Sequence, residues 1–578
     1  MNFKWKESLK GPLIAIAILG VGFFLFKHRL TIQTANARDD VPLKALDNSW
    51  AQGWHPQKAQ VDWKVKHVAA YLSSGGTSVA VADVNGDGYL DLHFTDPGGD
   101  PAGKLYLNNQ GKGFTLNNER IHLLPEKSVI NRSALLDLDD DGHLDLFLLG
   151  FCPRIAWGES NEGFKESETQ PLGCGTFGTG FNLADLDGDG QLEILIAPYV
   201  DLDFFGDLQD TNVMPTNFSH AMNGTKPSVF RRSGRSFQRI ETPIQHRGWA
   251  HSVAVWKMPD SKDTLLWFAN DYGIDRTYFV GPQGVMKEVS DSMITDAFSR
   301  NGMNSEIVDM DGNGRPSVYV SQIYLGAQKL AGNMFWRWSG GHEFVNKASE
   351  MGIHRCGWSW GAKFFDLEND GDLDLFVGNG FFAGEVPGKS YWYFLNVMDA
   401  ADKHVLSDAL RWPAIGGGAL SGEERACLFV KDHGQYKNRS QDVKDLADFT
   451  ANERGVALVD LDNSGRQALA TISWEQGPRI YRWEGAFGSW IGFDLHQAAP
   501  NRDAWGASVI LKLADGRTLG RQKQPLNAYA AQSDARLHFG LGAGEFPEGV
   551  TALITWPDGT QMELKNLKVG EYHSVVKP

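Results

Sequence analysis

The stretch Asp83-Val84-Asn85-Gly86-Asp87-Gly88-Tyr89-Leu90-Asp91 concentrates oxygen-bearing groups in nine consecutive residues. Carboxylate or amide oxygens occupy positions 1, 3, 5 and 9, a backbone carbonyl is available at position 7, and glycine at position 6 permits a sharp bend. Ca²⁺ takes roughly 6–8 oxygen ligands at about 2.3–2.6 Å in a tolerant geometry. The stretch therefore predicts a calcium-binding loop.

The same pattern returns along the chain, in full at Asp137, Asp185 and Asp366 and in weaker form at Asp309 and Asp460. The copy at Asp460 has Ser464 at position 5 and Ala468 at position 9, so we expect it to be free of metal. The predicted ligands of the four complete loops are Asp83, Asn85, Asp87, Tyr89 and Asp91; Asp137, Asp139, Asp141, His143 and Asp145; Asp185, Asp187, Asp189, Gln191 and Glu193; and Asp366, Glu368, Asp370, Asp372 and Asp374. Asp309, Asp311 and Asn313 form a weaker set, because Ser317 stands at its position 9.

The residues around each loop predict strands. An EF-hand would need flanking helices and a glutamate at position 12, where this chain has Phe94, Leu148, Ile196 and Val377. The flanks instead alternate apolar residues with small or polar ones, which is typical of strands. Each loop is expected to join two strands at a corner.

The spacing of the loops predicts a ring of repeated sheets. Successive first aspartates are 54, 48, 124, 57 and 94 residues apart. The longest gap holds strand-like residues 251–256 and 265–268 without an acidic loop, and the gap of 94 holds one unit plus an insertion at 381–448. Units of this length that close radially are propeller blades. We expect an all-β chain with a seven-bladed β-propeller over residues 49–485.

Composition excludes nucleic acid as a partner. The 578 residues include 71 acidic and 55 basic side chains, for a formal net charge of −16, and there is no long basic run to neutralise phosphates. The chain is long enough for two or three domains.

The N-terminus predicts export. Lys4, Lys6 and Lys10 precede an apolar run from Pro12 to Phe26, and Ala35-Asn36-Ala37 offers a signal-peptidase site. Residues 1–37 are either a cytoplasmic stub with a transmembrane anchor or a cleaved signal, followed by a linker at 38–48. The body is expected outside the cytoplasm, periplasmic or extracellular, anchored to the membrane or secreted.

The four cysteines suit an oxidising compartment. Cys152 and Cys174 flank one connection and are expected to form a local bridge, whereas Cys356 and Cys427 either pair or include a buried free thiol.

Two family resemblances rest on these motifs. The Asp-x-Asp-x-Asp-Gly-x-Leu-Asp loops resemble FG-GAP/VCBS repeats, the blades of integrin-α-type propellers, and residues 357–366 resemble the blade of the cartilage acidic protein (CRTAC) group. Residues 501–507, 515–517, 532–534, 537–542 and 556–559 resemble an ASPIC/UnbV domain, which sets a small β-sandwich-like domain at 486–578. The resemblance implies an exported protein that binds calcium.

Two further groups of residues have competing interpretations. His246, Arg247, His251 and His354 lie next to tryptophans before predicted inner strands, where packing is favoured over catalysis. Residues 556–559 are expected to form a tight turn between strands Val550–Thr555 and Gln561–Leu564.

The leading hypothesis for function is a calcium-binding, non-enzymatic binding or adhesion module for an exported protein or glycan. One alternative is an exported, polysaccharide-active enzyme that uses the propeller channel and its histidines. Another is a membrane-anchored scaffold or assembly factor. The insertion at 381–448 is either a partner surface or a helical cap.

Overall fold

The computed structural model describes residues 41–578 except 52–53, 55–60, 99, 101, 125–129, 151, 160–162, 168–171, 175–176, 201–223, 291–300, 325–331, 383–407, 413, 415–420, 423 and 547. Within this part strands dominate, as the sequence predicted. The short helices are η1 (Ser49–Ala51), η2 (Trp63–Val68), α2 (Ala69–Ser74), η3 (Asn118–Arg120), η6 (Ala409–Arg411) and α5 (Lys444–Ala447).

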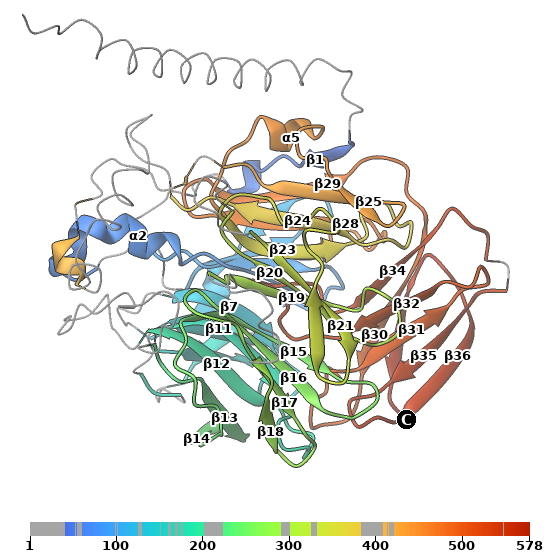
Figure 1. Cartoon of the computed structure of the whole chain (residues 1–578), viewed down its shortest axis with the longest axis horizontal. Helices are drawn as coiled ribbons and strands as arrows, with labels where there is room; N and C mark the ends of the chain where they lie inside the picture. The colour runs from blue at the N-terminus through green and yellow to red at the C-terminus, as the bar shows by residue number, and fades with distance from the viewer. Residues whose placement is uncertain are drawn as a thin grey trace, which may run out of the picture.

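Seven sheets, each mainly one antiparallel unit, follow one another along the chain (Figure 1). The first three contain β2 (Val79–Ala82), β3 (Asp91–Phe94), β4 (Lys104–Asn108) and β5 (Phe114–Leu116); β6 (Ile121–His122), β7 (Ile130–Leu136), β8 (Asp145–Gly150), β9 (Arg154–Glu159) and β10 (Gly163–Glu166); and β11 (Phe177–Ala184), β12 (Glu193–Val200), β13 (Ser228–Ser233) and β14 (Ser236–Ile240).

The next four sheets repeat the arrangement. They contain β15 (Ala250–Lys257), β16 (Thr264–Asn270), β17 (Arg276–Val280) and β18 (Met286–Glu288); β19 (Asn304–Val308), β20 (Ser317–Ser321), β21 (Met334–Gly340) and β22 (Glu343–Asn346); β23 (Ser359–Phe365), β24 (Asp374–Asn379), β25 (Cys427–Asp432) and β26 (Gln435–Asn438); and β27 (Glu453–Asp460), β28 (Gln467–Ser473), β29 (Gly477–Trp483) and β1 (Leu43–Ala45).

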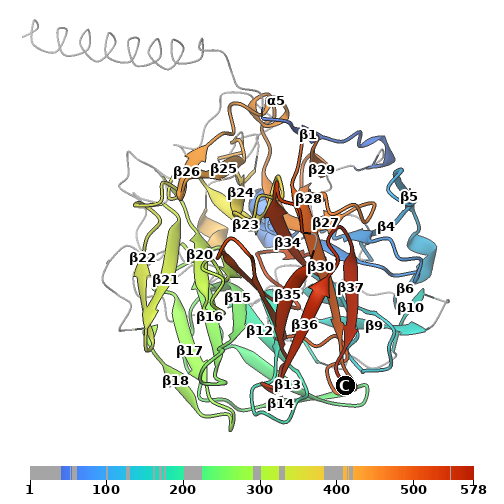
Figure 2. The same cartoon turned by 90° about the vertical axis from the view of Figure 1, so that its right-hand side faces the viewer.

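The seven sheets close into a ring (Figure 2). A separate cluster of buried apolar side chains lies between every pair of successive sheets, including the last and the first. The first strand of each sheet is the innermost, and these strands contact one another around the centre. Burial of apolar residues on both faces of each sheet therefore holds the ring together.

The N-terminal strand completes the last sheet. β1 pairs antiparallel with β29, with Leu43 opposite Trp483 and Ala45 opposite Tyr481. Leu43 is 2% exposed and belongs to the apolar cluster between the sixth and seventh sheets. The prediction of a linker over 38–48 is wrong at residues 43–45, because the last sheet needs a fourth strand that the C-terminal side of its sequence does not supply.

The C-terminal residues form a two-layer sandwich. One sheet contains β30 (Ser489–His496), β34 (Leu537–Gly542) and β37 (Tyr572–Val576), and the other contains β31 (Ser508–Lys512), β32 (Thr518–Gln522), β35 (Val550–Thr555) and β36 (Gln561–Leu567). Alternate residues such as Ile491, Phe493 and Val509 fill a common core. The predicted turn at 556–559 is confirmed, since the Trp556 amide donates to the Thr560 carbonyl (2.9 Å) and the Gly559 amide donates to the Trp556 carbonyl (2.8 Å).

The sandwich sends one segment back into the ring. β33 (Ala531–Gln532) pairs in parallel with β2, so Val79 lies opposite Ala531. We call residues 522–534 the channel segment. The boundary predicted at residue 485 therefore divides the sequence but not the packing, because part of 486–578 lies against the inner strands.

The insertion predicted at 381–448 is wrong in its second half. Residues 427–438 are β25 and β26, the outer hairpin of the sixth sheet, and Val377 pairs with Cys427 across the join. Apolar alternation in this hairpin is weak, since only Cys427, Leu428, Phe429 and Tyr436 are buried there. Residues 383–407, the aromatic part of the predicted insertion, lie outside the described residues.

Both cysteine pairs form disulfides. Cys152 is bonded to Cys174, as predicted, and Cys356 is bonded to Cys427, which decides between the two possibilities that the sequence left open. The second bond ties the start of the outer hairpin of the sixth sheet to the segment before its inner strand.

No helix among the described residues is long and apolar enough to cross a membrane. The apolar run from Pro12 to Phe26 lies outside those residues, so the transmembrane anchor and the cleaved signal both stay predictions.

Candidate metal loops and the domain that covers them

Each acidic loop joins the first and second strands of its sheet, the corner that the sequence predicted. In the first loop, the carboxylate at position 1, Asp83, accepts hydrogen bonds from the amides of Gly86 (2.8 Å), Asp87 (3.2 Å) and Gly88 (2.7 Å). The carboxylate at position 9, Asp91, accepts from the Val84 amide (2.9 Å). These bonds wrap the backbone around the two carboxylates, which satisfies orphan amides in a tight turn.

The other loops repeat this wrapping. In each of them the amide at position 6 donates to the carboxylate at position 1, over 2.6–3.2 Å. The glycine at position 6 has a positive φ in all six loops, between 79° and 94°, where a side chain would be strained. The loop at Asp460, which lacks two of the ligands, folds in the same way, so the backbone shape does not depend on a full set of carboxylates.

Position 4 is a signal that the sequence analysis missed. It also adopts the left-handed conformation in every loop, with φ between 57° and 84°. Glycine, Asp140, Asn369 and Asn463 occupy it, which are the residue types that tolerate this region best. Its composition, restricted to Gly, Asn and Asp, could have been recognised from the sequence.

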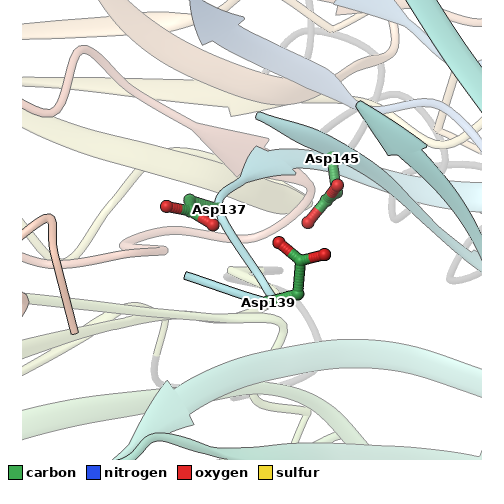
Figure 3. Close-up of side chains that lie close together, drawn as sticks. All are labelled: Asp137, Asp139 and Asp145. Carbon is green, nitrogen blue, oxygen red and sulfur yellow. The ribbon is translucent and has the colours of Figure 1, made fainter. Parts of the chain in front are cut away.

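Two loops bring three carboxylates together. Oxygens of Asp137, Asp139 and Asp145 lie within 4.8 Å of one another, and so do oxygens of Asp185, Asp187 and Glu193. Figure 3 shows the first set, with the side chains turned toward a common point. Carboxylate oxygens are the donors that Ca²⁺ prefers, so this donor set fits the ion. The acidic residues of the loops at Asp83, Asp309 and Asp366, all described, do not form such a group of three.

Burial and mutual repulsion make the converging carboxylates hard to ionise without a cation. Burial raises the pKa of Asp145 to about 8, and the charges of Asp139 and Asp137 act in the same direction. Burial likewise raises the pKa of Glu193 to about 7, with Asp187 adding to the rise. The same cause raises the pKa of Asp91 and of Asp366 to about 7. A bound divalent cation would reverse this effect, because it favours the charged form of each ligand.

Basic side chains from outer hairpins approach several loops. Arg235 donates to Asp139 (2.6 Å) and Asp141 (3.2 Å), Arg231 contacts Asp187 and Glu193, and Lys431 donates to Asp372 (2.6 Å). They supply part of the positive charge that the carboxylates require.

The sandwich packs on the loop side of the ring, and position 4 carries much of the contact. The Asn501 amide donates to Asp140 Oδ1 (2.9 Å), His538 Nε2 contacts Asn369 Oδ1 (2.8 Å) and Arg536 Nη1 donates to Asn463 Oδ1 (2.7 Å). In Figure 2 the sandwich lies in front of the ring. In these three loops position 4 therefore serves docking.

The C-terminal domain also contacts the loops at Asp309 and Asp460. Arg521 is partly buried, and its charge acts on Asp309 and Asp366, the first residues of two of the loops. The Tyr572 hydroxyl donates to Asp460 Oδ2 (3.0 Å). Protein groups thus meet the position-1 carboxylates of the two weak loops and also that of the complete loop at Asp366.

The channel segment contacts the inner strand of all seven sheets. Three amide side chains each pair with both the N–H and the C=O of one inner-strand residue: Gln522 with Lys257, Asn527 with Ile307 and Gln532 with Leu135, over 2.7–3.0 Å. The remaining contacts are Val79 N–H to Ala530 C=O (3.0 Å), Asn182 Nδ2 to Leu526 C=O (3.1 Å), Lys363 Nζ to Asn527 C=O (3.0 Å) and Asp534 N–H to Leu458 C=O (2.9 Å).

These contacts give hydrogen-bond partners to the backbone groups at the inner edge of each sheet. The inner strand of each sheet has unpaired backbone groups facing the centre of the ring, and buried groups of this kind need partners. The side-chain amides of the channel segment provide both a donor and an acceptor at the right spacing. This role could not be predicted from the sequence, since isolated Gln and Asn residues have many uses.

The structure does not gather the predicted channel residues into one site. His246 Nδ1 contacts the Tyr278 hydroxyl (2.9 Å), and burial lowers the pKa of His246 to about 3. His354 lies beside Arg355 and Tyr324 in the connection before β23. His251 alone reaches the channel segment, where its ring meets Tyr529 at 5.5 Å. Arg247 contributes its carbonyl to the Gly224 amide.

Comparison with known families agrees with the two-part organisation. The FG-GAP-like repeat matches residues 83–148 and 137–196, and ASPIC and UnbV matches residues 497–578. The chain thus carries FG-GAP-like repeats followed by an ASPIC/UnbV domain. No curated protein matches the sequence.

Solved structures with similar architecture are distant in sequence. The BP39L lectin from Burkholderia pseudomallei is 10% identical, with a TM-score of 0.40 over 72% of this chain and 99% of that one. YCF48 bound to D1 peptide is 10% identical, with a TM-score of 0.37 over 77% and 96%. BBS1N in complex with ARL6DN is 11% identical, with a TM-score of 0.37 over 72% and 94%. At these scores the likenesses say nothing about what this chain binds.

Proposed function

We propose that this chain is a calcium-binding module, located outside the cytoplasm, whose seven sheets are the blades of a seven-bladed propeller and which binds an exported protein or glycan. The observation that carries the proposal is the convergence of Asp137, Asp139 and Asp145, and of Asp185, Asp187 and Glu193, within 4.8 Å. The loops at Asp83 and Asp366 share the wrapping and the charge, and we include them among the calcium sites.

Calcium would act on structure in this proposal. A bound ion replaces repulsion among buried carboxylates with coordination and holds the corner between two strands. The same loops carry position 4, which contacts the ASPIC/UnbV domain through Asp140 and Asn369. Calcium occupancy would therefore stabilise the docking of that domain as well as the individual blades.

The partner surface that we propose lies away from the acidic loops. The chain's own C-terminal domain packs over those loops (Figure 2). On the side away from that domain, η2 contacts the segment of η6 (Figure 1). Trp63 in η2 is 78% exposed and Leu410 in η6 is 49% exposed. Exposed aromatic and aliphatic groups close together favour a binding surface.

The two disulfides support the proposed location. Structural disulfides persist in oxidising compartments and are rare in the cytosol of most organisms. A retained N-terminal anchor would make the module membrane-bound, which suits the alternative of a scaffold or assembly factor, whereas a cleaved signal would make it secreted.

The experiment is a crosslinking capture from native membranes by the full chain, with calcium and again with chelator. We expect one partner captured in calcium and lost with Trp63→Ala. Val285→Ser serves as the matched control, because Val285 is 69% exposed but lies in the hairpin between β17 and β18. Equal capture by wild type and W63A would reject the η2–η6 surface, and capture of nothing in either condition would reject the binding module.

A further inference from the structure

Two arginines lie inside the ring without a carboxylate partner. Arg132 in β7 is 3% exposed and Arg454 in β27 is fully buried. Among the described residues, neither has a carboxylate oxygen within 4 Å, in contrast to Arg154, which pairs with Glu166. A guanidinium cannot lose its proton at ordinary pH, so both sites carry a buried positive charge.

Arg454 has its hydrogen bonds largely filled. It donates to the carbonyls of Ser74 (2.8 Å), Gly380 and Phe381. Its guanidinium also lies 4.1 Å from the centre of the Trp360 ring. Carbonyls and an aromatic face solvate this cation, but they do not neutralise it.

The hydrogen-bond donors of Arg132 are less completely satisfied. It donates through Nη1 to the carbonyls of Gly75 (2.9 Å) and Asn131, and it lies 4.1 Å from the centre of the Tyr529 ring. Its Nε and Nη2 are buried and have no hydrogen-bond acceptor. Unmade bonds on a buried cation are costly, so these two N–H groups require a partner.

A small cavity lies beside these groups. Its volume is about 20 Å³, and its walls include Arg132 and His251 from the ring and Ala528 and Ala530 from the channel segment. His251 is 7% exposed and its Nδ1 has no partner. Asp271, the carboxylate closest to His251, lies 3.6 Å from its Nε2 and accepts the Tyr199 hydroxyl (2.6 Å). The charge of Asp271 thus faces the other side of the histidine ring.

We propose that this cavity binds a monatomic anion, chloride under physiological conditions, held by Nε and Nη2 of Arg132 beside His251. The volume admits one particle about the size of a water molecule and excludes sulfate or phosphate. A water molecule would complete the hydrogen bonds but would leave the buried charge of Arg132 without a counter-ion in the cavity. Chloride does both, and it fastens the channel segment to the ring because residues of both line the cavity.

The binding test compares thermal unfolding of the full chain in sodium chloride and sodium methanesulfonate at equal ionic strength, with calcium supplied as methanesulfonate. We expect the wild-type Tm to rise with chloride by about 1–2 °C and then saturate, as for a ligand that binds only the folded state. Arg132→Met should remove the rise. Arg315→Met is the matched control, because Arg315 pairs with Asp260 at the surface, and it should keep the rise.

A bromide-soaked crystal of the wild type tests the site directly and does not depend on whether R132M folds. An anomalous peak beside Arg132 Nε and Nη2 supports the proposal. A cavity that contains water without bromide, or a wild-type Tm that is the same in both salts, overturns it.

Discussion

At the scale of single residues, the nine positions of each acidic loop divide into two tasks. Positions 1, 3, 5 and 9 carry oxygens that face inward or accept backbone amides, and position 4 contacts the C-terminal domain in the loops at Asp137, Asp309, Asp366 and Asp460. Asp139 and Asp140 illustrate the division: the first joins the carboxylate group of its loop, whereas the second accepts hydrogen bonds from Asn501 and Arg502. Neighbouring aspartates in one motif thus have different partners and different functions.

The division predicts which aspartates couple stability to calcium. Asp141→Asn keeps an acceptor for the His143 amide (2.8 Å) but removes one charge from the proposed cage. We expect D141N to lower Tm in calcium, and to have the same Tm as wild type in chelator, because the ion is absent there. Differential scanning calorimetry in both conditions measures this.

The loop at Asp460, in the seventh sheet, supplies the control. Asp462→Asn changes position 3 of the loop that we expect to be metal-free, and its effect should not depend on calcium. A D141N chain that loses as much stability in chelator as in calcium would contradict the cage at that loop.

A buried histidine predicts a pH dependence that is independent of metal. His246 has its pKa lowered to about 3 by burial, with Arg276 acting in the same direction, while the unfolded chain titrates near 6.5. The neutral ring is favoured in the folded state, so its contribution to stability is complete above pH 6.5 and is lost as pH falls toward 3. The loss is about 1.4 kcal/mol for each pH unit below 6.5.

His246→Asn removes this titration while it keeps a side-chain amide near the Tyr278 hydroxyl. The advantage of wild type over H246N in the free energy of unfolding should shrink by about 2 kcal/mol between pH 7 and pH 5, measured by urea unfolding. An advantage that is constant over this range would show that the imidazole is not kept neutral.

At the scale of elements, the strand β1 has a larger role than its three residues suggest. Its backbone pairs with β29, and the Ala45 amide also donates to Asp445 (2.8 Å), so it links the last sheet to α5. A chain that starts at Val41 should fold like the parent. A chain that starts at Asp47 lacks β1, exposes the edge of β29 and leaves Leu43's place in the core empty.

We expect the shorter chain to have a lower Tm and a stronger tendency to associate, since free strand edges pair with other molecules. Thermal melts and light scattering of the two truncated chains, differing only in residues 41–46, test this. Equal Tm and equal scattering would mean that β1 is dispensable for ring closure.

At this same scale, elements with local sequence signals were predictable and elements with distant partners were not. The corners, the strands on either side of them, the degenerate fourth unit and the turn at 556–559 were predictable, because Asp, Gly and alternating apolar residues act locally. β1, the hairpin 427–438 and the channel segment were not. Their roles depend on partners that are distant in sequence, such as Trp483 for Leu43 and Leu135 for Gln532, and no local pattern records a distant partner.

The candidate site was predictable to the same extent. The sequence predicted the ligand positions, but it did not indicate that Arg231, Arg235 and Lys431 approach them from outer hairpins. It also gave no reason to expect a second domain on top of the loops.

At the scale of the whole molecule, ring and sandwich meet at very close range. A Cβ placed on Gly540 would lie 2.1 Å from Asp366 Oδ2 and 2.5 Å from the Asn369 Cα atom. Gly540→Ala therefore cannot be accommodated unless the sandwich shifts away from the sixth loop. The expected loss in the free energy of unfolding is about 1–3 kcal/mol, the usual range for overpacking.

Limited proteolysis gives a second readout of this substitution. G540A should be cut faster within the channel segment than wild type, because a displaced sandwich withdraws that segment. Gly75→Ala is the control, since a Cβ there meets nothing within 4 Å and the residue has an ordinary φ of −79°. Identical cleavage of G540A and wild type would show that the interface accommodates the added methyl group without a shift of the C-terminal domain.

The route of the chain through the ring has a consequence for biosynthesis. β1 comes from the start of the chain and closes the last blade, and the channel segment comes from near the end and pairs with β2 of the first. Neither closure can form until almost all of the polypeptide has emerged, so a nascent chain has open blades and an unfilled centre throughout its synthesis. A secretion pathway that transports unfolded chains would suit such a molecule, and a chain that stops before residue 522 would leave the inner strand edges open to chaperones and proteases.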